Sequence, residues 1–309
     1  MVRALVCPGQ GAQSIGMGKL LADEYSSAKA VFEEVDEALS ENLSSLIWKG
    51  DIEELTLTQN AQPALMAMSL AALRGLESEG FKPENCAYFA GHSLGEYSAM
   101  AMSKAISVSD AARLLRARGL AMQDAVPVGV GAMAAILGLN FATVQSLAAE
   151  AQAVGICQAA NDNDPSQVVI SGEKTAVELA IELAKNSGAK RAIMLPVSAP
   201  FHCELMAPAA EKMRIELDGI KIEPPIVPIV SNVSAQAISD PTEIKKLLVS
   251  QVTGSVRWRE SIMWMAKNNV DEIWEIGSGK ALSGMIRRID KNISLMSISS
   301  PDDIRTVKF

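Results

Sequence analysis

The sequence predicts an α/β protein in which a large, mostly parallel sheet is interrupted by a smaller inserted unit. Two observations predict this class. Residues 1–126 alternate short apolar stretches with longer helical ones, as the layers of an α/β sheet do. The order of elements then changes, and the first pattern returns after residue 198. We expect one domain from residues 1–127 and 198–309, and an inserted domain from residues 128–197.

The first part of the chain places two strands before glycine-rich turns. Residues 1–6 form an apolar strand pattern, and residues 86–90 form a second short buried strand followed by a helix from residue 96 to 102. Residues 110–124 also predict a helix, because apolar residues recur on one arc at about 100° per residue.

The middle of the chain carries the signature of the inserted unit. We predict, in order, a strand, a helix, two strands, a helix and a strand over residues 131–139, 141–153, 155–161, 167–171, 173–187 and 190–197. The order β-α-β-β-α-β is typical of a ferredoxin-like unit. Residues 228–232 and 270–276 are then predicted as strands of the larger sheet, with helices between and after them. A cleft between two such units is a usual place for a substrate.

A candidate nucleophile lies between the second strand and its helix, in Gly91-His92-Ser93-Leu94-Gly95. Glycines on both sides permit the strained turn that presents a serine hydroxyl, and the helix start offers the Leu94 N–H to a developing oxyanion. The pattern predicts a nucleophile elbow around Ser93. The alternative is a tight turn without catalytic function, because short serine motifs also occur by chance.

A serine hydroxyl needs a base, and the chain contains two histidines. His92 directly precedes Ser93 on an extended segment, so its side chain should point to the opposite face. His202 is therefore predicted as the base by elimination, although a single histidine in a loop also fits a structural role. Cys203 follows His202, and we do not expect it to act as the nucleophile because adjacent side chains in an extended loop point apart.

Arg118 falls near the centre of the apolar arc of the helix at residues 110–124. An unpaired buried guanidinium costs several kcal/mol, about 3–5, so Arg118 must meet an anion. Its planar fork suits a carboxylate held by two hydrogen bonds. Two partners stay open at this point: an internal Asp or Glu, or a carboxylate on the substrate.

Composition narrows the function classes. A net charge of −8 argues against nucleic-acid binding, and no apolar run reaches membrane-spanning length. The start of the chain lacks the pattern of a signal peptide, so we expect a cytoplasmic protein. The four cysteines form no C-x-x-C pair, and neither a metal site nor a disulfide framework is expected.

Two glycine-rich loops suggest nucleotide binding but fail on spacing. After Gly9 and Gly11, Ser14 stands where a dinucleotide motif needs its third glycine. Before Gly277-Ser278-Gly279-Lys280, Trp274 replaces the first glycine of a phosphate-binding loop, and Ala281 replaces its Ser/Thr. We therefore expect no bound cofactor.

With these residues in place, the chain resembles the malonyl-CoA:acyl carrier protein transacylases of bacterial fatty-acid synthesis over nearly its full length. One departure is Ser255, where the family often has proline. The shared motifs are Pro8-Gly9-Gln10-Gly11, Gln62-Pro63-Ala64, Gly91-His92-Ser93-Leu94-Gly95-Glu96, Arg118-Gly119 with Met122-Gln123, Asn163 with Pro165, Pro200-Phe201-His202, Gln251 with Val256-Arg257-Trp258, and Glu275-Ile276-Gly277.

The resemblance implies a hydrolase-like large domain with a ferredoxin-like insert, and a role for each site residue. Ser93 and His202 would form the catalytic dyad, Arg118 would bind the malonyl carboxylate, and Gln10 would complete the oxyanion hole with Leu94. The main-chain carbonyl of Gln251 would orient a histidine, His202, and Asn163 would have a supporting role of the same kind.

The resemblance also implies a ping-pong transfer through a malonyl-serine, with malonyl-CoA and a transiently bound acyl carrier protein as partners. We expect a monomer, no nucleic acid and no membrane. Two other classes stay open from the residues alone: a serine hydrolase, which would share the elbow and histidine, and a non-enzymatic binding module. Candidate basic residues for docking an acidic carrier protein are Lys190, Arg191, Arg287, Arg288 and Lys291, and ordinary solvated surface charges are the alternative.

Overall fold

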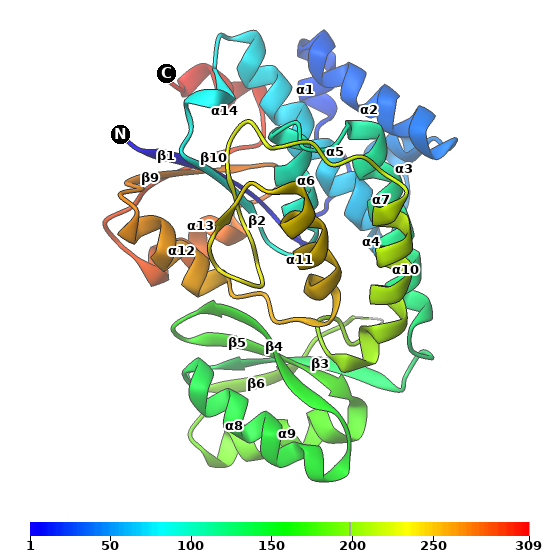
Figure 1. Ribbon diagram of the computed structural model, residues 1–309, viewed down its shortest axis with the longest axis vertical. Helices are drawn as coiled ribbons and strands as arrows, with labels where there is room; N and C mark the ends of the chain where they lie inside the picture. Colours follow the sequence, from blue (N-terminus) through cyan, green and yellow to red (C-terminus); the bar gives the residue numbers. More distant parts are fainter. Residues whose placement is uncertain (198, 309) are drawn as a thin grey trace.

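The computed structural model describes residues 1–197 and 199–308. The chain forms two layered bodies, one around a six-stranded sheet and one around a four-stranded sheet, which lies at the bottom of Figure 1. Both chain ends lie on the larger body. The predicted domain boundary at residue 198 falls outside the described residues.

The larger sheet is parallel except at one edge, as the sequence predicts. Its strand order is β10-β9-β1-β2-β7-β8, and only the pairing of β7 with β8 is antiparallel. The strand bounds are β1 Arg3–Cys7, β2 Tyr88–Gly91, β7 Ile229–Val230, β8 Ala237–Ile238, β9 Glu272–Ile276 and β10 Ser294–Ile298.

Both faces of this sheet are covered, which explains why its central strands are apolar throughout. Leu5 of β1 packs into the core on one face, while Ala4 and Val6 pack on the other face against Trp258 and Ile262. The bounds of the helices of this body are α1 Lys19–Glu24, α2 Ser26–Leu39, α3 Leu43–Lys49, α4 Ile52–Thr56, α5 Thr58–Ser78, α6 Leu94–Met102, α7 Val108–Asp124, α10 Ala207–Asp218, α11 Pro241–Thr253, α12 Trp258–Lys267, α13 Ala281–Ile289 and α14 Pro301–Thr306.

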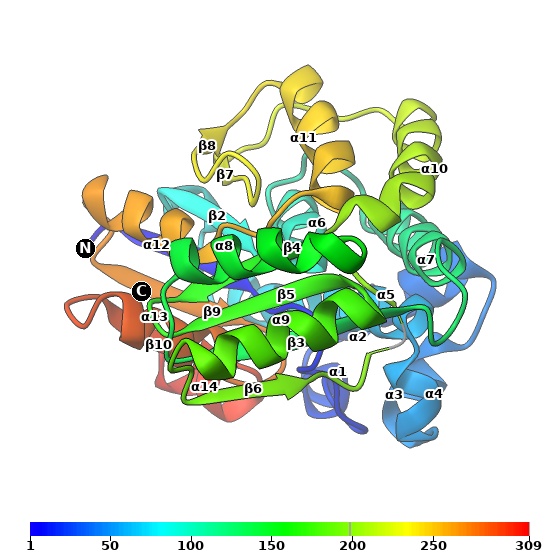
Figure 2. The same cartoon turned by 90° about the horizontal axis from the view of Figure 1, so that it is seen from below.

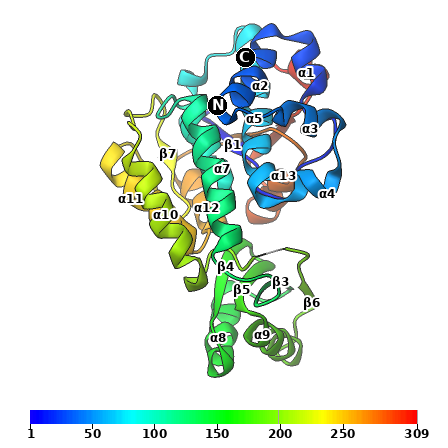
Figure 3. The same ribbon diagram turned by 90° about the vertical axis from the view of Figure 1, so that its right-hand side faces the viewer.

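Helices α5 and α7 both extend to the cleft and contribute residues to its lining. α5 is buried along most of its length and packs on α7, which runs down toward the smaller body in Figure 3. Within the described residues, no helix combines the length and the apolar character needed to cross a membrane.

The smaller sheet is antiparallel, with strand order β4-β5-β3-β6. Helices α8 and α9 cover one face, as Figure 2 shows from below. Between these helices and the sheet lies a separate apolar core. Met133 and Val169 on the other face join the core of the larger body. The bounds are β3 Gly131–Leu137, α8 Phe141–Ala151, β4 Cys157–Asp164, β5 Gln167–Glu173, α9 Lys174–Asn186 and β6 Arg191–Met194.

Strand β4 joins the two bodies. The Asp162 N–H donates to Val256 O at 2.9 Å, and the Val256 N–H donates to Ala160 O at 2.8 Å. Two buried carboxylates of the same strand form ion pairs of 2.8 Å with the larger body, Asp162 with Arg259 and Asp164 with Arg288. These contacts hold the two bodies in one arrangement around the cleft.

The sequence prediction was wrong at several elements. The chain after residue 276 was expected to be helical, but β10 forms there as an edge strand whose half-exposed side chains give a weak apolar signal. The short strand β8 was also missed. β4 extends to Asp164 rather than residue 161, because its last polar side chains are buried by ion pairs and hydrogen bonds that cross between the bodies.

Candidate active site

Ser93 lies in a sharp turn between β2 and α6. Its φ of 53° is strained for a residue with a side chain, and a strained conformation of this kind costs roughly 1–3 kcal/mol. A Cβ on Gly91 would lie 1.9 Å from the backbone of Gly95, and one on Gly95 would lie 2.4 Å from Cys7 O. Glycine is therefore required on both sides of the turn, as the elbow prediction assumed.

Asn232, from the segment after β7, holds this turn in place. Its Oδ1 accepts the Ser93 N–H at 2.8 Å, and its Nδ2 donates to Gly91 O at 2.7 Å. The next N–H, that of Leu94, is the first of α6 and has no protein acceptor among the described residues. It is available to an oxyanion at the positive end of the helix dipole.

The Ser93 hydroxyl contacts the second predicted residue, His202. The distance from Ser93 Oγ to His202 Nε2 is 2.7 Å. On the other side of the ring, Nδ1 lies 2.9 Å from Gln251 O and 3.1 Å from Gly254 O. Two carbonyl acceptors require the proton on Nδ1, so Nε2 is free to accept the proton of Ser93. A main-chain carbonyl thus occupies the position of the acid in a catalytic triad.

Burial and the positive charge of Arg118 lower the pKa of His202 to about 3. His202 is 4% exposed, and the neutral imidazole is the form that can act as a base. The ring therefore keeps its base form far below the pH at which an ordinary histidine loses it.

This protonation state gives a testable pH dependence. Inactivation of Ser93 by phenylmethanesulfonyl fluoride, an uncharged reagent, should have a rate constant at pH 5 within about twofold of that at pH 7. A histidine with the ordinary pKa of about 6.5 would lose roughly 25-fold over the same range. The measurement is the residual acyl-transfer activity with time at each pH, and a 25-fold loss would contradict the assignment.

The guanidinium of Arg118 is 1% exposed and faces the same hydroxyl. Nη1 donates to Gln62 Oε1 at 2.7 Å, and Nη2 donates to Gln251 Oε1 at 2.9 Å and to Ser93 Oγ at 3.1 Å. Among the described residues, no carboxylate forms an ion pair with it. The internal ion pair that the sequence left open is therefore not formed, and the positive charge has only neutral partners in direct contact.

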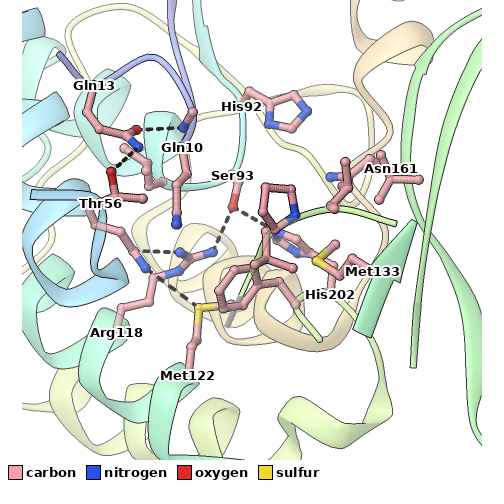
Figure 4. Close-up of a pocket in the computed structure, with 18 residues that line it drawn as sticks. Gln10, Gln13, Thr56, His92, Ser93, Arg118, Met122, Met133, Asn161 and His202 are labelled. Atoms are coloured by element: carbon pink, nitrogen blue, oxygen red, sulfur yellow. Dashed lines mark hydrogen bonds between the residues drawn. The ribbon is translucent and has the colours of Figure 1, made fainter. Parts of the chain in front are cut away.

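These groups line a cavity of about 370 Å³ between the two bodies, with β3 and β5 of the smaller sheet on its far side. Gln10, on the loop after β1, points its amide into this cavity in Figure 4 and donates through Nε2 to Thr58 Oγ1 at 3.3 Å. The cavity thus gathers a serine hydroxyl, a neutral imidazole, a main-chain N–H, an amide and a buried cation. This set can exchange acyl groups that carry a carboxylate.

Asn163 was predicted to orient or support a histidine, and the histidine that it contacts is His92. Its Oδ1 lies 2.9 Å from Nε2 of His92, so it supports the histidine that precedes the nucleophile. His92 also packs edge-on against Trp258, with ring centroids 5.7 Å apart. Asn163 therefore ties the elbow to the smaller body, and its side chain contacts His92.

The sequence also missed the contacts of Gln62, Asn232 and the side chain of Gln251. It points to Gln62 only as part of a shared motif and to Gln251 only through its carbonyl, because an amide that binds an arginine has no local sequence signal. Cys203 is buried and donates to Pro200 O at 3.1 Å, which agrees with the expectation that it is not the nucleophile. No cluster that could hold a metal occurs among the described residues.

The comparisons with known proteins agree with this geometry. Residues 4–277 match the acyl transferase domain family. The malonyl CoA-acyl carrier protein transacylase of Bacillus subtilis is 47% identical over 97% of this chain and 94% of its own length, and that of Escherichia coli is 42% identical over 96% of each.

Solved structures give the same result. The acyl-carrier-protein-S-malonyltransferase of Bartonella henselae is 52% identical, covers 99% of this chain and 98% of its own, and superposes with a TM-score of 0.97. A malonyl-transacylase solved in complex with its type II PKS acyl-carrier protein is 39% identical over 99% and 98% of the two chains, with a TM-score of 0.96. The chain belongs to the acyl transferase domain family, among the malonyl-CoA:acyl carrier protein transacylases.

Proposed function

We propose that this chain transfers a malonyl group from malonyl-CoA to the phosphopantetheine thiol of acyl carrier protein, for fatty-acid synthesis, through a malonyl ester on Ser93. The observation that carries the proposal is the position of one hydroxyl between two groups. Ser93 Oγ contacts the neutral base His202 at 2.7 Å and the buried cation Arg118 at 3.1 Å.

In the first half-reaction, Ser93 Oγ attacks the thioester carbonyl while His202 Nε2 takes its proton. The carbon–sulfur bond breaks, and the proton on Nε2 passes to the departing thiolate of coenzyme A. The imidazolium that forms in between is stabilised by the carbonyls of Gln251 and Gly254, which accept from Nδ1. The second half-reaction reverses these steps with the carrier-protein thiol.

The negative charge of each tetrahedral intermediate falls on the carbonyl oxygen. The Leu94 N–H and the Gln10 amide are the proposed donors to it, and removing one such donor in other enzymes costs about 2.7–4 kcal/mol. The support for Leu94 is its uncommitted N–H at the start of α6, and the support for Gln10 is its amide in the cavity.

Arg118 would supply the selectivity. Esterification converts the Ser93 hydroxyl, which Nη2 now contacts, into an ester oxygen, which is a weaker acceptor. The N–H released from it, with the remaining N–H of Nη1, forms a fork for the malonyl carboxylate. An acetyl group would leave this buried charge without its partner. A serine hydrolase, the alternative from the sequence, has no use for such a clamp.

The experiment that tests the function uses malonyl-CoA and phosphopantetheinylated carrier protein. Intact mass spectrometry should show malonyl-carrier protein formed by catalytic amounts of the enzyme, and carrier protein without its phosphopantetheine should gain nothing. Release of free malonate at the rate of malonyl-CoA consumption, with no carrier product, would instead identify a hydrolase.

The domain organisation and the partners are part of the same proposal. The larger body, residues 1–127 and 198–309, would be a hydrolase-like domain, and residues 128–197 a ferredoxin-like insert; the order β4-β5-β3-β6 supports the latter. We propose a monomer that binds the carrier protein transiently. Arg287 is exposed and suits docking, whereas Arg288 is committed to the ion pair with Asp164.

A further inference from the structure

Glu96 is a buried carboxylate that the proposed transfer does not use. It lies in the first turn of α6, three residues after Ser93, and is 1% exposed. Among the described residues, no lysine, arginine or histidine forms an ion pair with its carboxylate. Burying a carboxylate without an ion pair costs folding free energy, so its position beside Ser93 suggests a function.

The carboxylate binds the side chain that holds Arg118. Glu96 Oε2 accepts from Gln251 Nε2 at 2.7 Å and from the Asn232 N–H at 3.2 Å. The same Gln251 Nε2 donates to Ser93 O at 2.9 Å, and Gln251 Oε1 accepts from Arg118 Nη2 at 2.9 Å. Glu96, Gln251 and Arg118 thus form one hydrogen-bond network that ends at the Ser93 hydroxyl.

This hydrogen-bond network permits one orientation of the Gln251 amide. If the amide were rotated by half a turn, its oxygen would face two acceptors, Glu96 Oε2 and Ser93 O, and its NH₂ would face the donors of Arg118. Without Glu96, one of the two acceptors of the Gln251 NH₂ group would be lost, and the opposition to that rotation would weaken. The acceptor on Glu96 therefore strengthens the orientation in which the Gln251 oxygen faces the guanidinium.

We propose that Glu96 is a positioning residue for acyl-group selection: it orients the Gln251 amide, which in turn fixes the Arg118 guanidinium against Ser93. The inference rests on the proposed function of Arg118. It assigns Glu96 no contact with the substrate, so its removal should weaken the use of acyl groups that carry a carboxylate and leave the use of acetyl groups nearly unchanged.

The first test compares Glu96→Leu with Glu96→Gln in single-turnover acylation by malonyl-CoA and by acetyl-CoA. The leucine in Glu96→Leu removes the acceptor, and we expect the malonyl kcat/KM to fall about tenfold or more, as for a lost buried hydrogen bond. The acetyl kcat/KM should stay within about threefold of the wild-type value. The glutamine in Glu96→Gln can present its amide oxygen to Gln251 and should rescue the malonyl value.

Met100→Leu, another fully buried position on α6, is the matched control for disturbed packing and should leave the ratio of the two values unchanged. An equal loss of malonyl and acetyl acylation in Glu96→Leu would overturn the inference. Failure of the proposed function is distinguishable, because the wild-type protein would then form no malonyl adduct at all.

A second test does not depend on the leucine variant folding. Burial raises the pKa of Glu96 to about 7, and Arg118 opposes this shift. Arg118 from α7 is the charged group that acts on it, and Tyr97 on α6 is a titratable neighbour whose own pKa Glu96 raises. The hydrogen-bonding partners Gln251, Asn232 and Ser231 are neutral. A deprotonated Glu96 repels a malonyl carboxylate bound at Arg118, so the protonated form favours malonyl over acetyl.

The malonyl-to-acetyl ratio of kcat/KM in the wild-type protein should therefore fall as pH rises through about 7. Taking the ratio removes contributions from His202 that both substrates share. Glu96→Gln carries no titrating charge, so its ratio should match the wild-type ratio at pH 6 and exceed it at pH 8.5. A parallel decline in both proteins would overturn the inference.

Discussion

Mixed with malonyl-CoA in the absence of carrier protein, the wild-type protein should gain one malonyl group per chain, and Ser93→Ala should gain none. The substitution removes the hydroxyl that lies between His202 Nε2 and the Arg118 guanidinium in the cavity. Without this nucleophile the covalent step has no acceptor, and transfer to carrier protein should be lost almost completely. Intact mass and peptide mapping measure both outcomes.

The control for this experiment is Cys203→Ser. Cys203 is the nearest competing nucleophile in sequence to His202, and a serine there can keep the hydrogen bond to Pro200 O. This variant should gain the malonyl group as the wild-type protein does. A malonyl adduct that persists in Ser93→Ala and disappears in Cys203→Ser would refute the assignment of the nucleophile.

The second large effect is expected for Arg118→Ala. Its malonyl kcat/KM should fall roughly 30- to several-thousand-fold, which corresponds to about 2–5 kcal/mol for a carboxylate buried without its partner. Acetyl transfer should fall much less, so the preference between the two acyl groups should move toward acetyl. The measurement is the kcat/KM for each acyl-CoA with one carrier protein.

Two further variants separate the possible causes. Arg113→Ala lies on the same helix, but its side chain is 55% exposed and paired with Asp110, so both kcat/KM values should stay near wild type. Arg118→Lys keeps the charge but loses the planar fork, and an intermediate loss is expected. An unchanged malonyl preference in Arg118→Ala would show that the clamp is assigned wrongly.

Local patterns were sufficient for the order of elements in the smaller unit and for the helix at residues 110–124. These elements follow apolar periodicity, which depends on residues a few positions apart. The prediction failed where burial comes from distant partners. β4 continues through Asn163 and Asp164 because Arg288 and His92 pair with them across the cleft, and β10 adds to the edge of a sheet formed by remote segments.

By itself, the sequence predicted which residues meet in the cavity. The glycines around Ser93 encode a local backbone turn, the small number of histidines left His202 as the predicted base, and the apolar arc around Arg118 placed that arginine in the interior. Each of these inferences depends on short-range geometry or on composition, and both can be read from one chain.

Only the tertiary structure decided what surrounds them. Gln251 lies 133 residues from Arg118 and 155 from Glu96 along the chain, yet its side chain contacts both, and its main-chain carbonyl accepts from His202. A carbonyl acceptor has no residue type that marks it. Whether Arg118 meets an internal carboxylate or an open cavity depends on which distant segments pack beside it, and that is a property of the folded chain.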